Sequence, residues 1–393
     1  MGFVRRTPSG RFQAGWRDGA GRQRAKNFDR QKDAKAFLAE IESTIVKGSY
    51  IDPSAGRVLF STVAESWFSG YSAEPTTVTR ARMALNNQVL PQWGDVPIGK
   101  IDHLGVAAWV KDLRQRRAPA TVTKALQVMS AVMKSAVRSR MIAVNPCESV
   151  KVNGGQRAVK PGVAISRDDF DRLLAAVPGE KRLLPALSGY CGLRWGEAAG
   201  LDWQHVDLDT GELTVAQVAI EIAGVVAIRK HPKTAAGHRV IPIPDALHEM
   251  LSAARLTSRS DLVCPTATGS PHRRANFRKQ VWRPSLVRAG LLGEVGEVHT
   301  GQWEAVWKAE NSVIRSEAFD TEAEAVAAVV TRDVGGIRFH DLRHSYTTWF
   351  VSAGVPVNIA QRLLGHAQAS TTLNRYTHHL SGGHDEVGRV FGG

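Results

Sequence analysis

The sequence predicts an α+β, multidomain protein, and three observations lead to this fold class. Its 393 residues are too many for one ordinary hydrophobic core. The spacing of apolar residues changes from alternation near the N-terminus to a helical period in the middle, and to a mixed pattern from about residue 165. A strand-helix pattern from the N-terminus also returns inside the last region. We therefore expect a small strand-helix domain, an all-helical domain, and a mixed, mainly helical domain with a β-hairpin sheet and an inserted second strand-helix unit.

Residues 1–50 form the first predicted domain. Phe12, Ala14 and Trp16 alternate as in a strand, residues 19–21 suit a turn, and a second strand runs toward Phe28. From about Gln31, residues on one helical face are apolar. The strands carry basic side chains that we predict to contact DNA, namely Arg17, Arg22, Arg24 and Lys26. A plain hairpin core with basic neighbours is the alternative.

Residues 57–150 predict helices only. The clearest helix begins near Pro119, and its apolar stripe comprises Val122, Leu126, Met129 and Met133. Basic residues occupy its other faces and are further candidates for DNA contact: Lys124, Lys134 and Arg138. Residues 151–163 are basic and Gly-rich, which is typical of a linker.

The composition limits the classes of partner. A formal net charge of +14 favours a polyanion, and nucleic acid is the first candidate because basic surfaces release counterions from phosphates. A basic protein without a nucleic-acid partner is the alternative. No apolar run approaches the roughly 20 residues that span a bilayer, and no apolar signal core follows the first arginines. The three cysteines show no paired spacing, so we expect neither disulfides nor a zinc site, and a reducing cytoplasm.

Residues 164–393 predict the mixed domain. Helices are expected at 167–176 and 182–191, and strands at 213–218, 225–229 and 239–243. The last two strands would form a β-hairpin whose turn holds Lys233. Spacing alone makes Lys233 an ordinary exposed turn lysine.

An internal repeat lies within this domain. Residues 302–330 repeat residues 11–39 at a constant offset of 291, so that Trp16 matches Trp307 and Phe28 matches Phe319. An ungapped match through two aromatic residues predicts the same small fold twice, with the second copy inserted at about 295–335.

The two copies differ in charge. Residues 11–39 hold eight Lys/Arg against three Asp/Glu, a net charge of +5, whereas residues 302–330 hold two against six, a net charge of −4. A surface that follows phosphates is hard to build from the second set. Our hypothesis is that the first copy binds DNA, while the inserted copy contacts protein or only decorates its domain.

Five residues suggest chemistry on a phosphodiester. Arginine matches two phosphate oxygens with its planar fork and stays charged, so two arginines from distant segments can hold both non-bridging oxygens. His340 and Arg343 are spaced to share one helical face. A tyrosine hydroxyl at Tyr376 can then act as nucleophile, with Tyr346 as the rival that its apolar neighbours place in the core. The set, in chain order, is Arg194, His340, Arg343, His366 and Tyr376.

This order of residues resembles the tyrosine recombinase (phage integrase) family, over some 340 residues of the chain. The resemblance implies that 1–50 is an arm-type DNA-binding domain, 57–150 a core-binding domain and 164–393 the catalytic domain. It also makes Lys233, in its Lys-Thr…Arg-x-x-Pro setting, a catalytic candidate, with Lys230 as the substitute. The acidic insert is a departure from the family pattern. Ala-, Arg- and Val-rich usage favours a high-GC bacterial or phage source. Within the family, the chain resembles the actinobacterial phage or prophage type.

The resemblance further implies a mechanism without metal, ATP or other cofactor. Tyr376 would form a 3′-phosphotyrosine, Lys233 would protonate the leaving 5′-oxygen, and His340 would act as general base. Arg194, Arg343 and His366 would bind the phosphate, and Glu197 would orient Arg194 or His340. We expect a homotetramer on double-stranded DNA with core and arm-type sites, helped by a DNA-bending protein and an excisionase, in the cytoplasm of a bacterial host. The tail after Tyr376 would dock within its own subunit or on a neighbour.

Two other functions stay open. The first is a recombinase that resolves chromosome or plasmid dimers, against which the extra basic N-terminal domain argues. The second is a catalytically silent DNA-binding regulator, which the intact set of five residues opposes. The attachment-site sequences and the bias between integration and excision do not follow from the sequence.

Overall fold

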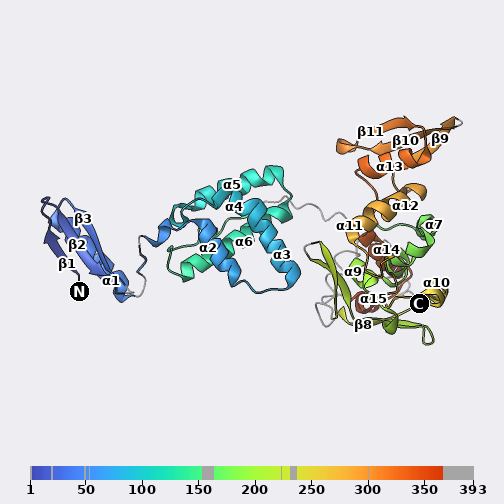
Figure 1. Cartoon of the computed structure of the whole chain (residues 1–393), viewed down its shortest axis with the longest axis horizontal. Helices are drawn as coiled ribbons and strands as arrows, with labels where there is room; N and C mark the ends of the chain where they lie inside the picture. The colour runs from blue at the N-terminus through green and yellow to red at the C-terminus, as the bar shows by residue number, and fades with distance from the viewer. Residues whose placement is uncertain are drawn as a thin grey trace, which may run out of the picture. The chain divides into compact units, whose positions relative to one another are not determined.

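The computed structural model describes residues 2–18, 21–47, 50–52, 54–152, 163–222, 224–230, 237–299 and 301–365. The chain divides into two compact units, residues 1–157 and 158–393 (Figure 1). Each unit is described by itself. Within the described residues, no helix has the length and apolar character needed to cross a bilayer.

The N-terminal module is a three-stranded antiparallel sheet with one helix. Strands β1 (Phe3–Arg6), β2 (Phe12–Arg17) and β3 (Gln23–Phe28) lie in that order, and helix α1 (Gln31–Val46) follows. Ala14 and Trp16 are buried with Ala34 and Leu38 of α1, as the alternation predicted. The sequence had not indicated β1, whose residues lack a clear alternating pattern.

The helical domain comprises α2 (Phe60–Ser69), α3 (Pro75–Ala84), α4 (Leu90–Trp93), α5 (His103–Arg116) and α6 (Pro119–Arg138). A π-helical stretch, Leu85–Val89, joins α3 to α4. The predicted stripe of α6 is buried in the core of this domain, since Val122, Met129 and Met133 are fully inaccessible. All-helical architecture is therefore confirmed for this part.

The second unit is mainly helical. Its helices before the insert are α7 (Arg167–Ala176), α8 (Leu183–Cys191), α9 (Trp195–Ala199), α10 (Asp245–Thr257), α11 (Arg274–Phe277) and α12 (Arg283–Arg288). After the insert come α14 (Phe339–Ser352) and α15 (Val357–Leu364). Helix α8 packs along α14, and both bury apolar residues such as Leu187 and Leu342 in one core.

The strands of this unit correct one prediction. Residues 213–218 belong to two strands of different sheets, because β5 (Glu212–Val215) ends before β6 (Val218–Ile222) begins. β4 (Val206–Asp207), β5 and β8 (Arg239–Pro242) form one sheet, while β6 pairs with β7 (Val225–Arg229).

The predicted hairpin between β7 and β8 is therefore wrong. Ile241 of β8 lies opposite Leu213 of β5, and both side chains are buried. Burial of these two side chains sets the pairing of β5 with β8, so β7 and β8 belong to different sheets.

The insert repeats the N-terminal module strand for strand. Strands β9 (Glu294–His299), β10 (Gln302–Lys308) and β11 (Ile314–Phe319) precede α13 (Glu322–Arg332). Trp307 lies opposite Arg315 as Trp16 lies opposite Arg24, at the predicted offset of 291. Ala305, Trp307 and Ala325 are buried like Ala14, Trp16 and Ala34. The prediction of the same small fold twice is confirmed.

Helix α12 holds the insert through one buried arginine. The Arg283 guanidinium donates from Nε to the Val330 carbonyl at 2.7 Å and from Nη2 to the Asp333 carbonyl at 2.7 Å. The entry and exit of the insert also adjoin, because a Cβ placed on Gly293, whose φ is 54°, would lie 3.4 Å from the Asp333 carboxylate. Asp333 in turn accepts from the Lys308 N–H at 2.8 Å.

We predict that Arg283→Met lowers the free energy of unfolding by about 2 kcal/mol, because buried carbonyls lose their donors. Urea denaturation followed by circular dichroism measures this change. Arg288→Met on the exposed side of the same helix is the matched control and should stay within about 0.5 kcal/mol of the wild type. Equal stabilities of the two variants would contradict this account of the attachment.

Candidate active site

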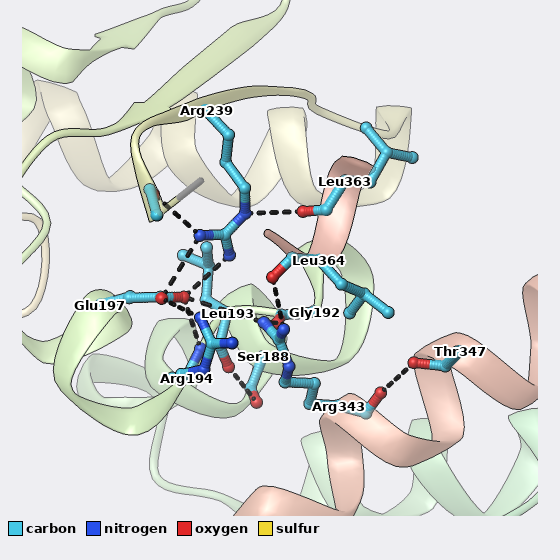
Figure 2. Close-up of polar contacts among 11 residues, drawn as sticks. Ser188, Gly192, Leu193, Arg194, Glu197, Arg239, Arg343, Thr347, Leu363 and Leu364 are labelled. Atoms are coloured by element: carbon cyan, nitrogen blue, oxygen red, sulfur yellow. Dashed lines mark hydrogen bonds and ion pairs between the residues drawn. The ribbon is translucent and has the colours of Figure 1, made fainter. Parts of the chain in front are cut away.

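Charged residues from distant parts of the second unit meet at Glu197 (Figure 2). Gly192 caps the C-terminus of α8, and its φ of 63° lies in the left-handed region that glycine readily adopts. After this turn, Arg194 is the residue that precedes α9. Glu197 lies in the first turn of α9, where its Oε2 accepts the Arg194 N–H at 2.9 Å. A carboxylate at this position is also favoured by the helix dipole. This short local contact therefore sets the position of Glu197 relative to Arg194.

Glu197 binds two guanidinium groups directly. Its Oε1 accepts from Arg194 Nη1 at 2.7 Å, and its Oε2 accepts from Arg239 Nη2 at 2.8 Å. Arg343 Nη1 lies 3.9 Å from Oε2. Burial alone would raise the pKa of Glu197, but Arg239, Arg194 and Arg343 together lower the pKa to about 2. One ionised carboxylate therefore serves three arginines, which leaves the cluster with surplus positive charge.

The two predicted arginines do come together, and their surroundings differ. Arg194 keeps 40% of its side chain exposed, whereas the Arg343 side chain is 3% exposed. Arg343 donates from Nη1 to the Gly192 carbonyl at 2.5 Å and from Nη2 to the Leu364 carbonyl. Arg194 is therefore accessible to a ligand from solvent, whereas Arg343 is buried in the protein.

His340 lies one turn before Arg343 on α14, as the spacing predicted. Burial, followed by the nearby His344, Arg343 and Arg194, lowers the pKa of His340 to about 4, although Asp341 opposes the shift. The ring is therefore neutral at pH 7 and can accept a proton. The start of the helix is capped by Asp341, which accepts the Arg338 N–H at 2.7 Å. Because Asp341 already caps the N-terminus of α14, capping this helix does not account for His340.

Tyr346 belongs to the core, as the sequence indicated. Its side chain is among the buried residues at 3% exposure, and its ring lies 4.5 Å from that of Phe350. Burial raises the pKa of its hydroxyl well above the usual range. A phenol in this position cannot reach a DNA phosphate without unfolding α14.

Lys233, His366 and Tyr376 lie outside the described residues, as does the tail after Tyr376. Gly365, the left-handed residue that closes α15, is the last described residue and directly precedes His366. The roles of these residues remain predictions. Lys230, the substitute for Lys233, is described and exposed.

Arg239 is a member of the cluster that sequence reasoning missed. It is 7% exposed, and it begins β8 on the same face as the buried Ile241. The signal was present, because strand alternation from Ile241 and Ile243 places Arg239 toward the core. A buried arginine requires a carboxylate or carbonyl partner, which the sequence could not name.

The predicted DNA contacts of the N-terminal module are divided between two faces. Arg24 and Lys26 lie opposite Trp16 and Ala14, so they share the face that α1 covers. Arg24 binds the buried Asp18 at 3.1 Å, and Lys26 lies 4.7 Å from the Phe37 ring centroid. Arg17 lies on the opposite, open face and is exposed, and Arg22 is exposed beside Asp18. On α6, Lys134 and Arg138 are exposed and Lys124 is half-buried.

No group of three His, Cys, Asp or Glu residues in the described part of the chain is arranged to hold a metal ion. The arginine and histidine cluster combines charge, burial and partial access. Such a cluster can bind a phosphate through Arg194 and accept a proton through His340.

Three family models match the chain. They are "Phage integrase, N-terminal domain" over residues 1–47, "Phage integrase central domain" over 60–153 and "Phage integrase family" over 307–382.

Relatives carry the same description. The putative prophage phiRv2 integrase of Mycobacterium tuberculosis is 24% identical over 98% of this chain and 94% of its own length. A tyrosine recombinase XerC-like protein of Caldanaerobacter subterraneus subsp. tengcongensis is 26% identical over 72% of this chain and 68% of its own.

Solved structures share the fold. The Tn1549 transposon integrase in complex with a circular intermediate DNA has a TM-score of 0.62 at 16% identity, covering 84% of this chain and 99% of that one. A lambda integrase tetramer bound to a Holliday junction has a TM-score of 0.53 at 13% identity, covering 95% and 94%. The predicted fold class is confirmed.

We predict that the His340 ring titrates near pH 4 in the DNA-free protein rather than near 6.5, since burial and neighbouring positive charges oppose its protonation. The folded pKa is depressed, so the stability that neutral His340 preserves is present above pH 6.5 and is lost as pH falls toward 4. Histidine-selective NMR measures the titration, with His340→Gln to assign the signal. A midpoint at or above 6.5 would contradict the burial of this ring.

Proposed function

We propose that this chain, which belongs to the phage integrase family of tyrosine recombinases, integrates and excises phage or mobile-element DNA through a 3′-phosphotyrosine on Tyr376. Recombination at specific DNA sites is the activity of the family. The observation that supports this chemistry in the chain is the pairing of accessible Arg194 with buried Arg343 around one carboxylate, beside a neutral His340.

The cluster suits the start of strand cleavage. A scissile phosphate that binds Arg194 would face a site with more positive than negative charge, and its developing charge would be stabilised by groups already in place. His340 would accept the phenol proton of Tyr376 as the tyrosine oxygen attacks phosphorus. The bond to the 5′-oxygen breaks, and Lys233 would supply the proton for that leaving group. His366 would add a hydrogen bond to the phosphate.

Rejoining reverses these steps with another strand. The 5′-hydroxyl of the partner strand attacks the phosphotyrosine and gives its proton to Lys233, which lost one during cleavage. The bond between phosphorus and the tyrosine oxygen breaks, and His340, now protonated, returns its proton to that oxygen. The covalent intermediate conserves the energy of the phosphodiester, so no ATP is required.

The assembly we propose is a tetramer on double-stranded DNA, as in the lambda integrase tetramer bound to a Holliday junction. The helical domain would bind the core site and the N-terminal module the arm-type site. A DNA-bending protein and an excisionase would set the direction. The N-terminal module favours this role over the resolution of chromosome dimers, because the matching family model is that of a phage integrase N-terminal domain.

We predict that the wild type forms a covalent adduct with a nicked attachment-site duplex in EDTA, and that Tyr376→Phe forms none, because it lacks the attacking oxygen. Denaturing gel electrophoresis detects the adduct. Tyr346→Phe is the matched control and should retain the adduct, since Tyr346 is a core residue. An adduct from Tyr376→Phe would assign the nucleophile elsewhere. Failure of the wild type on its native attachment site would favour the silent regulator.

The repeat offers a test of which module binds DNA. Arg17 and Lys308 occupy equivalent, exposed positions at the end of the second strand of each module. We predict that Arg17→Gln in the full chain weakens binding to arm-site DNA and lowers the salt slope of the binding constant by about 1. Lys308→Gln should change neither quantity, because the acidic insert does not follow phosphates. Fluorescence anisotropy across a salt series measures both, and equal effects would overturn the proposed division between the modules.

A further inference from the structure

Arg239 joins parts of the site that are distant in sequence. Its guanidinium takes both oxygens of Glu197, from Nη2 at 2.8 Å and from Nη1 at 3.3 Å. Its Nε donates to the Leu363 carbonyl at 2.6 Å, and Nη1 also donates to the Gly237 carbonyl at 3.2 Å. Figure 2 shows this side chain between Glu197 and the end of α15. A lysine could not satisfy these acceptors together, because its ammonium group lacks the planar fork.

The first consequence concerns charge. Glu197 is 4% exposed and ionised, so it needs a cation beside it. Arg239 meets that need from the buried side. Without it, Arg194, which already donates to Glu197 Oε1 at 2.7 Å, would be left as the main counterion of Glu197, because Arg343 lies 3.9 Å away. The charge of Arg194 would then be largely cancelled within the protein. Arg239 thus leaves the positive charge of Arg194 available to a phosphate.

The second consequence concerns the end of α15. The last carbonyls of a helix lack partners within the helix. Arg239 binds the carbonyl of Leu363, and Arg343 binds that of Leu364. Gly365 then turns the chain, and His366 is the next residue, with Tyr376 ten residues later. The point from which the segment with the proposed nucleophile departs is therefore fixed by two buried arginines.

We propose that Arg239 is a positioning residue for strand cleavage, which balances the charge of Glu197 and anchors the end of α15. It touches no DNA and acts through Arg194 and through the segment after Gly365. The inference depends on the proposed function and adds a residue to it.

The main test compares Arg239→Met with the wild type in single-turnover cleavage of the nicked attachment-site duplex, scored per folded molecule. We expect a loss on the order of 100-fold, as when one preorganised donor of a reaction site is removed. Binding of the same duplex should change by less than about 3-fold, because the DNA surface is intact. Arg239→Lys, which keeps charge without the fork, should recover part of the loss.

Arg283→Met is the matched control for burial. Arg283 is 8% exposed and also binds main-chain carbonyls, but at the insert. It should lose stability without losing cleavage per folded molecule. If both variants lose cleavage equally, the effect of Arg239 is a general effect of destabilisation and the proposal is wrong.

Two further comparisons test the charge argument. Glu197→Gln added to Arg239→Met removes the unbalanced carboxylate, so the double variant should cleave about 10-fold faster than Arg239→Met alone. A methylphosphonate at the scissile position is uncharged and depends less on Arg194, so the deficit of Arg239→Met should shrink on that substrate. A double variant no faster than the single one, or an equal deficit on both substrates, would overturn the charge-balancing role.

The anchoring role is tested without DNA. Hydrogen exchange of the amides in residues 360–365 should speed up in Arg239→Met and stay unchanged in Arg283→Met. Unchanged exchange in Arg239→Met would overturn the anchor. These outcomes are distinct from failure of the proposed function, in which the wild type itself forms no adduct.

Discussion

The ionised carboxylate of Glu197 is the interaction on which the site depends. Four elements reach it or its partners: α9 supplies Glu197, β8 supplies Arg239, α14 supplies Arg343, and α15 ends against both buried arginines. A buried charge tolerates little rearrangement, because each lost partner leaves a desolvated ion. Because Glu197 must keep its arginine partners, the elements that carry these residues are held in one arrangement although they are distant in sequence.

Spacing predicted one part of the site, the shared helical face of His340 and Arg343 on α14. Arg194 and Glu197 became candidates through the resemblance to the family. Arg239 was not predicted, and the hairpin before it was wrong, because both depend on strand pairing between β5 and β8. That register is set by burial of Leu213 against Ile241, a contact between distant residues which alternation alone does not specify.

The two copies of the repeat share their buried aromatic positions and differ in surface charge. Trp16 and Trp307 occupy equivalent buried positions, so the core anchors kept the match visible at an offset of 291. The charge reversed between the copies, while the pairing of the second strand with the third kept the same register. The pleat places Arg24 and Lys26 on the same face of the sheet as Trp16 and Ala14, whereas Arg17 lies on the other face.

The two ends of the insert, at Gly293 and Asp333, lie close together, so the insert leaves and rejoins the second unit at nearly the same point. A module whose two ends meet can be gained or lost in evolution by a local event, because the chain before and after it keeps almost the same path. Helix α14, which carries His340 and Arg343, begins only a few residues beyond Asp333, yet its start is fixed by its own Asp341 cap. The inserted copy can thus differ in charge from the N-terminal module while the start of α14, and with it the placement of His340 and Arg343, keeps its own cap.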